Sequence, residues 1–129
     1  MRGEAEFQYL VLRVIPSLAR GEMINAGVVV YCPARDYLGA RVGLDRERLS
    51  ALPSEGVDPD QVAASLEGLR RIAEGDPQAG PLARMPAAER FGWLAAPAST
   101  SIQASPAHTG FTDDPAATLD RLYKVLVAG

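Results

Sequence analysis

The sequence predicts an α+β fold: a single domain, residues 1–129, with a mainly antiparallel sheet of about four strands and two or three helices packed on one face. Apolar, β-branched runs come early in the chain and are joined by short connections. Segments with helical periodicity come later. The length of 129 residues and the hydrophobic content of 47% suit one domain with its own core.

Three strands are expected in the first third of the chain. Phe7 to Ile15 is apolar on both faces and stops before Pro16, so it predicts a central strand. Val28 to Cys32 is short and β-branched, which favours a buried strand over a helix. Asp36 to Val42 alternates with period two, which predicts a third strand with one side in solvent. The connection Ala34-Arg35 is short enough for a hairpin.

Two helices are expected further along, each begun by an acidic cap before a proline. Asp58 precedes the first, which ends at Gly75, and Asp113-Asp114-Pro115 opens the second. Their apolar stripes are Val62, Leu66, Leu69 and Ala73 in the first, and Leu119, Leu122, Tyr123 and Leu126 in the second. Each is expected to carry an i,i+4 ion pair on its outer face, Glu67 with Arg71 and Asp120 with Lys124.

The region between these helices is read less directly. Pro86 to Leu94 is either a short helix or an irregular segment that places Trp93 in the core. Phe91 and Trp93 are expected as core anchors, with an exposed Trp at an interface as the alternative. Ser99 to Ser105 predicts a fourth strand. The expected core comprises Tyr9, Val11, Val14, Val28, Val29, Val30, Leu66, Leu69, Leu119, Leu122 and Leu126.

Charge and cysteine content narrow the class of partner. The net charge of −3 disfavours nucleic acid, whose binding normally needs a basic face. One Cys32 and one His108 provide neither an internal disulfide nor a zinc site, so no metal or cofactor is expected. No apolar run approaches the roughly 20 residues that span a bilayer, and the N-terminus lacks a signal-peptide pattern. We therefore expect a cytoplasmic protein without membrane contact.

Polar residues are densest between the first two strands, where Ser17 to Met23 is expected as a loop. The polar and turn-forming positions there are Arg13, Pro16, Arg20, Gly21, Glu22, Asn25 and Gly27. If the strands pair antiparallel, these groups face one loop and could meet. A guanidinium beside a carboxylate makes a charge-assisted hydrogen bond. Asn25 can hold a turn, and Gly27 permits close backbone approach.

This pattern carries a family resemblance. The residues are Tyr9-x3-Arg13-x2-Pro16-x3-Arg20-Gly21-Glu22-x2-Asn25-x-Gly27-Val28-Val29. They resemble the DUF3037 proteins, bacterial domains of about this length with no assigned function, and the similarity continues through Thr100-Ser101-Ile102-Gln103 and Leu122-Tyr123-x3-Val127. Genes of that family often sit beside genes for HipA-like kinases, which implies such a kinase as partner. The resemblance supplies no catalytic residues.

For Arg13, Arg20, Glu22 and Asn25 three interpretations stay open: a polar clasp that fixes the strand connection, an anion or partner site, and catalysis. The first functional hypothesis is a non-enzymatic accessory module that docks a protein partner through the Arg20 to Asn25 loop. The second is a small enzyme or ligand-binding protein for an anionic metabolite, with Arg13 and Arg20 as an anion clamp and Glu22 or His108 as base. We favour the first, and thus no enzymatic activity.

Four further features are expected to be structural. His108 is expected as a neutral loop residue, unless folding places it beside Glu22, Arg20 or the Ser99-Thr100-Ser101 run. The three hydroxyls of that run lack a nucleophile elbow and are expected on a strand face. Cys32 is expected as a buried thiol, without a flanking positive group to activate it. The third strand is a candidate open edge, at which a second copy or a partner strand could pair.

Overall fold

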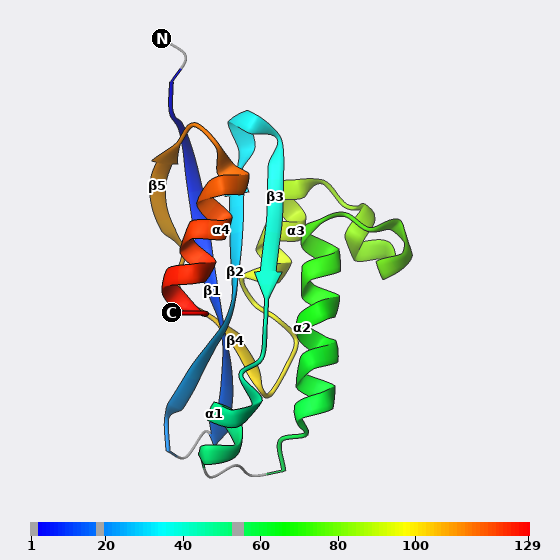
Figure 1. The fold of residues 1–129 in the computed structure, drawn as a ribbon. Helices are drawn as coiled ribbons and strands as arrows, with labels where there is room; N and C mark the ends of the chain where they lie inside the picture. The colour runs from blue at the N-terminus through cyan, green and yellow to red at the C-terminus, as the bar shows by residue number, and fades with distance from the viewer. Residues whose placement is uncertain (1–2, 18–19, 53–55) are drawn as a thin grey trace.

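One antiparallel sheet of five strands organises the chain (Figure 1). The computed structural model describes residues 3–17, 20–52 and 56–129. The strands lie in the order β3-β2-β1-β4, and β5 pairs with the same edge of β1 as β4 does. Their bounds are β1 Ala5–Ser17, β2 Glu22–Cys32, β3 Tyr37–Val42, β4 Ile102–Ala104 and β5 His108–Thr112. The predicted α+β class with an antiparallel sheet is therefore confirmed.

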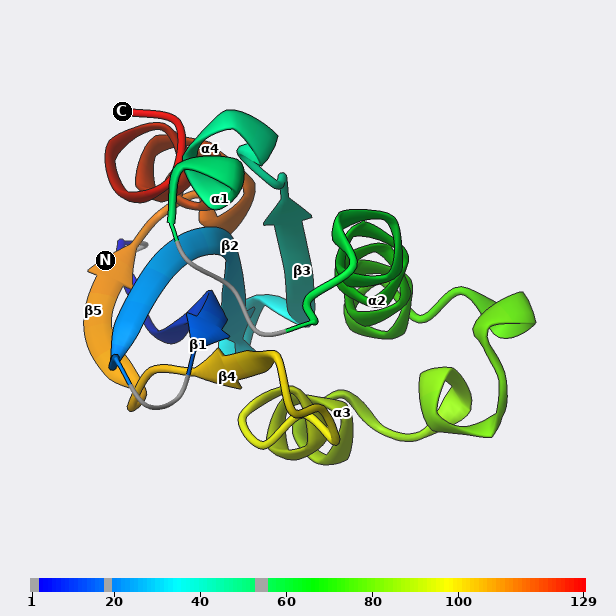
Figure 2. The ribbon, with the colours of Figure 1, turned by 90° about the horizontal axis from the view of Figure 1, so that it is seen from below.

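Helices cover both faces of this sheet. They are α1 Arg46–Ala51, α2 Pro59–Ala73, α3 Ala87–Leu94 and α4 Pro115–Leu126, with short 3₁₀ turns at Pro33–Arg35, Pro77–Ala79 and Pro81–Arg84. One cluster of buried side chains joins β1, β2 and β3 to α1, α2 and α3, and a second joins β1 and β2 to α4. Figure 2 shows α3 and α4 on opposite sides of the strands. The expectation of cover on one face is wrong, because apolar residues on both faces of β1 and β2 need two partners.

A β-bulge decides which residues of β2 face which layer. Val28 and Val30 point to the α4 cluster, while Val29 points to the opposite one. Leu12 pairs with Gly27, but the next residue, Arg13, pairs with Asn25, so β2 carries one extra residue there. The shift turns Asn25 towards the α4 side, level with Arg13, as the period of two requires after a bulge.

Most predicted elements are present with different ends. β1 and β2 run further than expected, so Ser17, Glu22 and Met23 of the expected loop lie in strands, and residues 18 and 19 of that loop lie outside the described residues. The segment left open between helix and irregular structure is the helix α3. The predicted fourth strand shrinks to Ile102–Ala104. Two elements were not predicted: α1, and β5, which holds His108 in a strand and not in a loop.

The predicted core agrees closely with the buried residues. Val11, Val14, Val28, Val29, Val30, Leu66 and Leu119 are buried. Tyr9, Leu69, Leu122 and Leu126 are half-buried and pack against the clusters. The two predicted helix caps are confirmed, because Asp58 accepts from the backbone N–H of Asp60 and Asp114 from that of Ala117.

The ion pairs on the helices differ from those predicted. Glu67 pairs with Arg70, one residue earlier than the predicted Arg71, and Arg71 turns to Asp76 beyond the helix end. Asp120 pairs with Arg41 of β3 and not with Lys124. Spacing along one helix cannot reveal partners that the fold brings from another segment.

Candidate functional site

The β1–β2 turn contains one exposed ion pair. The Arg20 Nε donates to Glu22 Oε1 over 2.9 Å, with side-chain exposures of 55% and 29%. Gly21 between them has a φ of +68°, a left-handed conformation that favours glycine. The Arg-Gly-Glu sequence thus forms a local turn in which the guanidinium and the carboxylate satisfy each other.

Arg13 and Asn25 form a second pair, away from the turn. They are opposite each other across β1 and β2, and Gln103 lies opposite Arg13 on β4. Asn25 Nδ2 donates to the carbonyl of Leu126 over 3.0 Å, which ties β2 to the C-terminal end of α4. Among the described residues, none shares a hydrogen bond or ion pair with the half-buried Arg13 guanidinium.

The four predicted site residues therefore form two pairs and not one cluster. Glu22 lies level with Ser17, four residues along β1 from Arg13, which corresponds to about 13 Å of strand. His108 lies level with Tyr9, on whose ring it stacks at 5.0 Å between centroids. Tyr9 and Ser17 are separated by about 26 Å of strand, so His108 and Glu22 do not meet.

The remaining candidates have plain structural surroundings. Ser99 Oγ accepts from the backbone N–H groups of Ser101 and Ile102, so the Ser-Thr-Ser run forms a turn that starts β4, and not the expected strand face. Cys32 is buried, as predicted, with its Sγ 3.5 Å from the carbonyl oxygen of Glu6. Within the described ranges, the hydrogen bonds of Cys32 Sγ and Ser99 Oγ join backbone groups alone.

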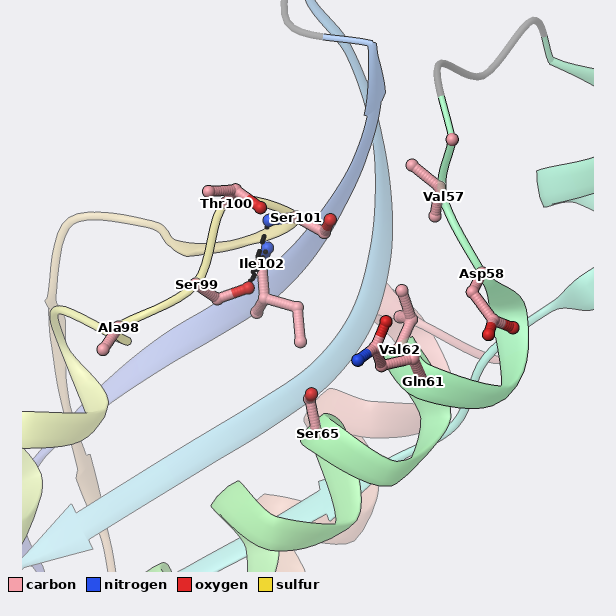
Figure 3. A pocket seen from close by; sticks show the side chains of 11 residues that line it. Val57, Asp58, Gln61, Val62, Ser65, Ala98, Ser99, Thr100, Ser101 and Ile102 are labelled. Atoms are coloured by element: carbon pink, nitrogen blue, oxygen red, sulfur yellow. Dashed lines mark hydrogen bonds between the residues drawn. The ribbon is translucent and has the colours of Figure 1, made fainter.

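A hollowed surface lies along α2 and is lined in part by the same Ser99-Thr100-Ser101 run. A first hollow of about 590 Å³ separates the N-terminal half of α2 from residues 98–102 (Figure 3). A second hollow of about 320 Å³ lies between α2 and α3. The two share Ser65, Ala98, Ser99 and Ile102, so they lie next to each other, and we call them together the α2–α3 groove.

The two ends of the α2–α3 groove differ in chemistry. Asp58, Gln61, Ser65, Ser99, Thr100 and Ser101 give the first hollow a polar wall. Leu69, Ile72, Leu82, Trp93, Leu94 and Pro97 give the second an apolar one. Figure 3 shows Gln61 and Ser65 on α2 facing Ser99 and Ile102 across the gap. The groove could thus hold a molecule with one polar and one apolar part.

Trp93 stands in the wall of this groove with half of its surface in solvent (50%). It also lines a third hollow, with Met85, Glu89, Gly92 and Ala96. The expectation of Trp93 as a core anchor is therefore wrong, whereas Phe91 is buried as predicted. In a helix, Phe91 and Leu94 point to the core together, and Trp93 is about 200° around the axis from Phe91. If residues 87–94 had been assigned as a helix, the position of Trp93 on the side opposite Phe91 would have predicted its exposure.

Arg90 joins the two helices that border the groove. Its Nη1 donates to the carbonyls of Ile72 and Ala73 over 3.1 and 2.6 Å, and its Nε to that of Met85 over 2.9 Å. These carbonyls belong to the end of α2 and the approach to α3. A single guanidinium therefore satisfies helix-end acceptors and fixes the spacing of the groove walls.

The other arginines of α2 are engaged by carboxylates. Arg70 bonds both Glu67 and Glu74, which raises the Arg70 pKa and lowers the pKa of Glu67. Arg71 lies 2.8 Å from Asp76 and lowers the pKa of that carboxyl, assisted by the Gln78 backbone N–H. These pairs are fixed on the outside of α2 and leave its groove side without a positive charge from this helix.

The described ranges contain neither a metal-binding cluster nor a membrane-spanning helix. No three His, Cys, Asp or Glu side chains among the described residues are grouped so that they could hold a metal ion. No helix within the described part of the chain has the length and apolar character needed to cross a bilayer.

Comparison with known proteins identifies one relationship. The family model described as "Protein of unknown function (DUF3037)" matches residues 9–127. No curated protein and no solved structure matches the chain.

Proposed function

We propose that this chain, which belongs to the DUF3037 family of proteins of unknown function, is a non-enzymatic binding module that docks a protein partner through the α2–α3 groove. The observation that carries the proposal is the half-exposed Trp93 beside an apolar hollow. Large aromatic side chains that stay in solvent next to concave apolar surface mark protein interaction sites, and Trp is the residue most enriched in binding hot spots.

The walls of the second hollow support a protein over a small polar ligand. Leu69, Ile72 and Leu82 line it together with Trp93, and no charged side chain does. Burial of such apolar surface by a partner lowers the free energy of the complex, because the surface is removed from water. Arg90 holds α2 and α3 at a fixed spacing, so the groove exists before the partner arrives and little ordering is required on binding.

Genes of the DUF3037 family often sit beside genes for HipA-like kinases, so such a kinase is the first partner to test. The segment Arg20 to Asn25, which comprises the end of the β1–β2 turn and the start of β2, is the second surface that it could use. An exposed ion pair such as Arg20–Glu22 adds little binding energy by itself, because solvent screens it. The groove is therefore the primary site of the proposal, and the turn is its comparison surface.

An affinity capture with matched baits tests this function. Gly68 lines the second hollow, and a Cβ built on it meets nothing within 4 Å, so the side chain introduced by Gly68→Leu starts in open space and projects into the groove. Ala64→Leu, on an exposed position of α2 outside the groove, is the control. Each bait is first shown to be folded by its melting curve. We then expect wild type, Ala64→Leu and Arg20→Ala to capture the partner and Gly68→Leu to lose it.

The converse pattern would contradict the groove as the site. If Gly68→Leu retains the partner and Arg20→Ala loses it, the contact surface is the β1–β2 turn. Purified HipA-like kinase from the same host, mixed with the same four proteins, then decides the identity of the partner.

A second candidate function rests on the unpaired Arg13. Its guanidinium shares a sheet face with Asn25 and lacks a partner among the described residues, so it could bind a carboxylate or phosphate. Inorganic phosphate would then raise the melting temperature, as any ligand of the native state does. Arg13→Gln should remove that gain. Arg20→Ala should retain it, because Arg20 is already paired and lies at the far end of the hairpin. An equal gain in Arg13→Gln would dismiss this candidate.

A further inference from the structure

We infer that the segment docked in the α2–α3 groove carries apolar side chains with lysine or arginine on both sides of them. This inference rests on the proposed docking function and adds the chemistry of the partner. We argue it from the charged side chains on either side of the second hollow and from the length of the groove along α2.

Two carboxylates flank the second hollow, one inside the α2–α3 groove and one in the neighbouring third hollow, which shares Trp93 with it. Asp58 is the charged residue in the wall of the first hollow, and Glu89 is the charged residue in the wall of the hollow beyond Trp93. The apolar second hollow lies between them. Both acids are exposed, and no ion pair among the described residues includes either. A partner with apolar anchors meets a negative charge on each side.

The basic side chains of this region are committed to other groups. Between residues 58 and 99 there are six acidic and four basic residues, a net charge of −2. Arg70 and Arg71 are paired with carboxylates, and Arg84 and Arg90 donate to backbone carbonyls. The free charge next to the groove is therefore negative, and a positively charged segment is complementary to it.

The length of the groove suits a short segment. The wall of the groove extends from Asp58, the cap of α2, to Ile72, a span of 15 residues that corresponds to about 21 Å of helix. An extended chain covers about 21 Å with six or seven residues. A heptapeptide therefore spans this wall, with one terminal basic residue near Asp58, its apolar centre over the second hollow, and its other basic residue on the side of the Trp93 hollow that contains Glu89.

Trp93 provides the readout, because it is the sole tryptophan of the chain. The probes are two acetylated and amidated heptapeptides with the same three-leucine centre, one with lysine and the other with glutamate at both ends. We expect the lysine peptide to shift Trp93 emission and to bind about tenfold more tightly at low salt. The preference should shrink to about twofold at roughly 0.5 M salt, because the charges are exposed.

Two double variants locate the charges. Asp58→Asn with Glu89→Gln removes both carboxylates, and the cap of α2 is retained because Asn caps as well as Asp. This variant should bind both peptides equally. Glu4→Gln with Glu47→Gln removes the same charge from exposed positions outside the α2–α3 groove and should keep the tenfold preference.

The outcomes separate this inference from the proposed function. Equal binding of both peptides by wild type, no binding of either, or a preference that persists without Asp58 and Glu89 overturns the inference. The docking function is judged separately, by whether Gly68→Leu loses the captured partner. A partner lost with Gly68→Leu together with equal peptide binding leaves the function standing and rejects the basic flanks.

Discussion

Arg90→Ala should destabilise the protein more than any substitution of an exposed arginine. The guanidinium makes three hydrogen bonds to carbonyls, and a bond with a charged donor contributes about 1.5–3 kcal/mol when intact. The contributions are unequal. The Ile72 carbonyl keeps a second donor, the Gly75 backbone N–H at 3.1 Å, whereas the Ala73 carbonyl loses its partner within a residue that is fully buried.

The expected loss follows from this difference. We count the bonds to the Ala73 and Met85 carbonyls in full and discount the bond to Ile72, and we reduce the sum because Arg90 is partly exposed to solvent. The expected loss in the free energy of unfolding is then about 2–4 kcal/mol. Arg90→Lys should recover little, because one ammonium cannot reproduce the fork that reaches acceptors on two segments. Arg84→Ala removes a single bond, 3.1 Å long, to the Pro77 carbonyl and should cost under about 0.5 kcal/mol.

Urea unfolding followed by far-UV circular dichroism measures these losses, since Trp93 is too exposed to report core packing reliably. The reasoning fails if Arg90→Ala unfolds within about 0.5 kcal/mol of wild type, or if Arg90→Lys is as stable as wild type. Either result would mean that packing of α3 on the sheet, and not the guanidinium, holds the groove walls.

Four further predictions concern stability. Gly68→Ala should stabilise by about 1 kcal/mol, measured as a melting-temperature rise of about 3–5 °C, because an open helical position gains a better helix former. Gly27→Ala should cost about 1–3 kcal/mol in urea unfolding, since its Cβ would lie 3.0 Å from Val42 Cγ1 and 3.1 Å from a backbone oxygen. Asn25→Ala should cost about 1 kcal/mol by the same assay, through loss of its bond to the end of α4. Burial, followed in size by the charge of Asp120, raises the pKa of Tyr37 above its ordinary value of 10.0. The stability that the neutral phenol contributes is therefore intact below pH 10 and is lost as the pH rises through the folded pKa. Unfolding at alkaline pH should therefore show a smaller pH-dependent loss in Tyr37→Phe than in wild type.

The sequence predicted the parts of the fold that depend on local pattern. The apolar runs of β1 and β2 and the Asp caps of α2 and α4 are signals that neighbouring residues carry, and they appear where expected. β5 has no such signal, because His108–Thr112 becomes a strand through pairing with the long β1. The cover of the second face also depends on a distant partner, as α4 covers strands that precede it by more than 80 residues.

The candidate site was less predictable for the same reason. The Arg20–Glu22 pair is two residues apart and could be inferred from sequence. The bond from Asn25 to Leu126 and the clamp of Arg90 on the Ala73 carbonyl join residues that only the fold brings together. The groove is formed by hollows between elements, and a sequence pattern encodes no empty space.

The unfilled space between α2 and α3 lowers the stability of α2, and steric packing does not require it. Two packed helices normally fill the space between them with large side chains. Here α2 presents Ser65 and Gly68 to that space, and Gly68 has neither a positive φ nor a neighbour that a Cβ would touch. The glycine therefore costs helix stability, about 1 kcal/mol, without relieving any steric conflict in the isolated chain. Arg90 compensates for the missing contact by fixing the far end of α2. A leucine at position 68 would project into this space, so Gly68→Leu is the substitution that separates a groove needed for docking from one that is only unfilled.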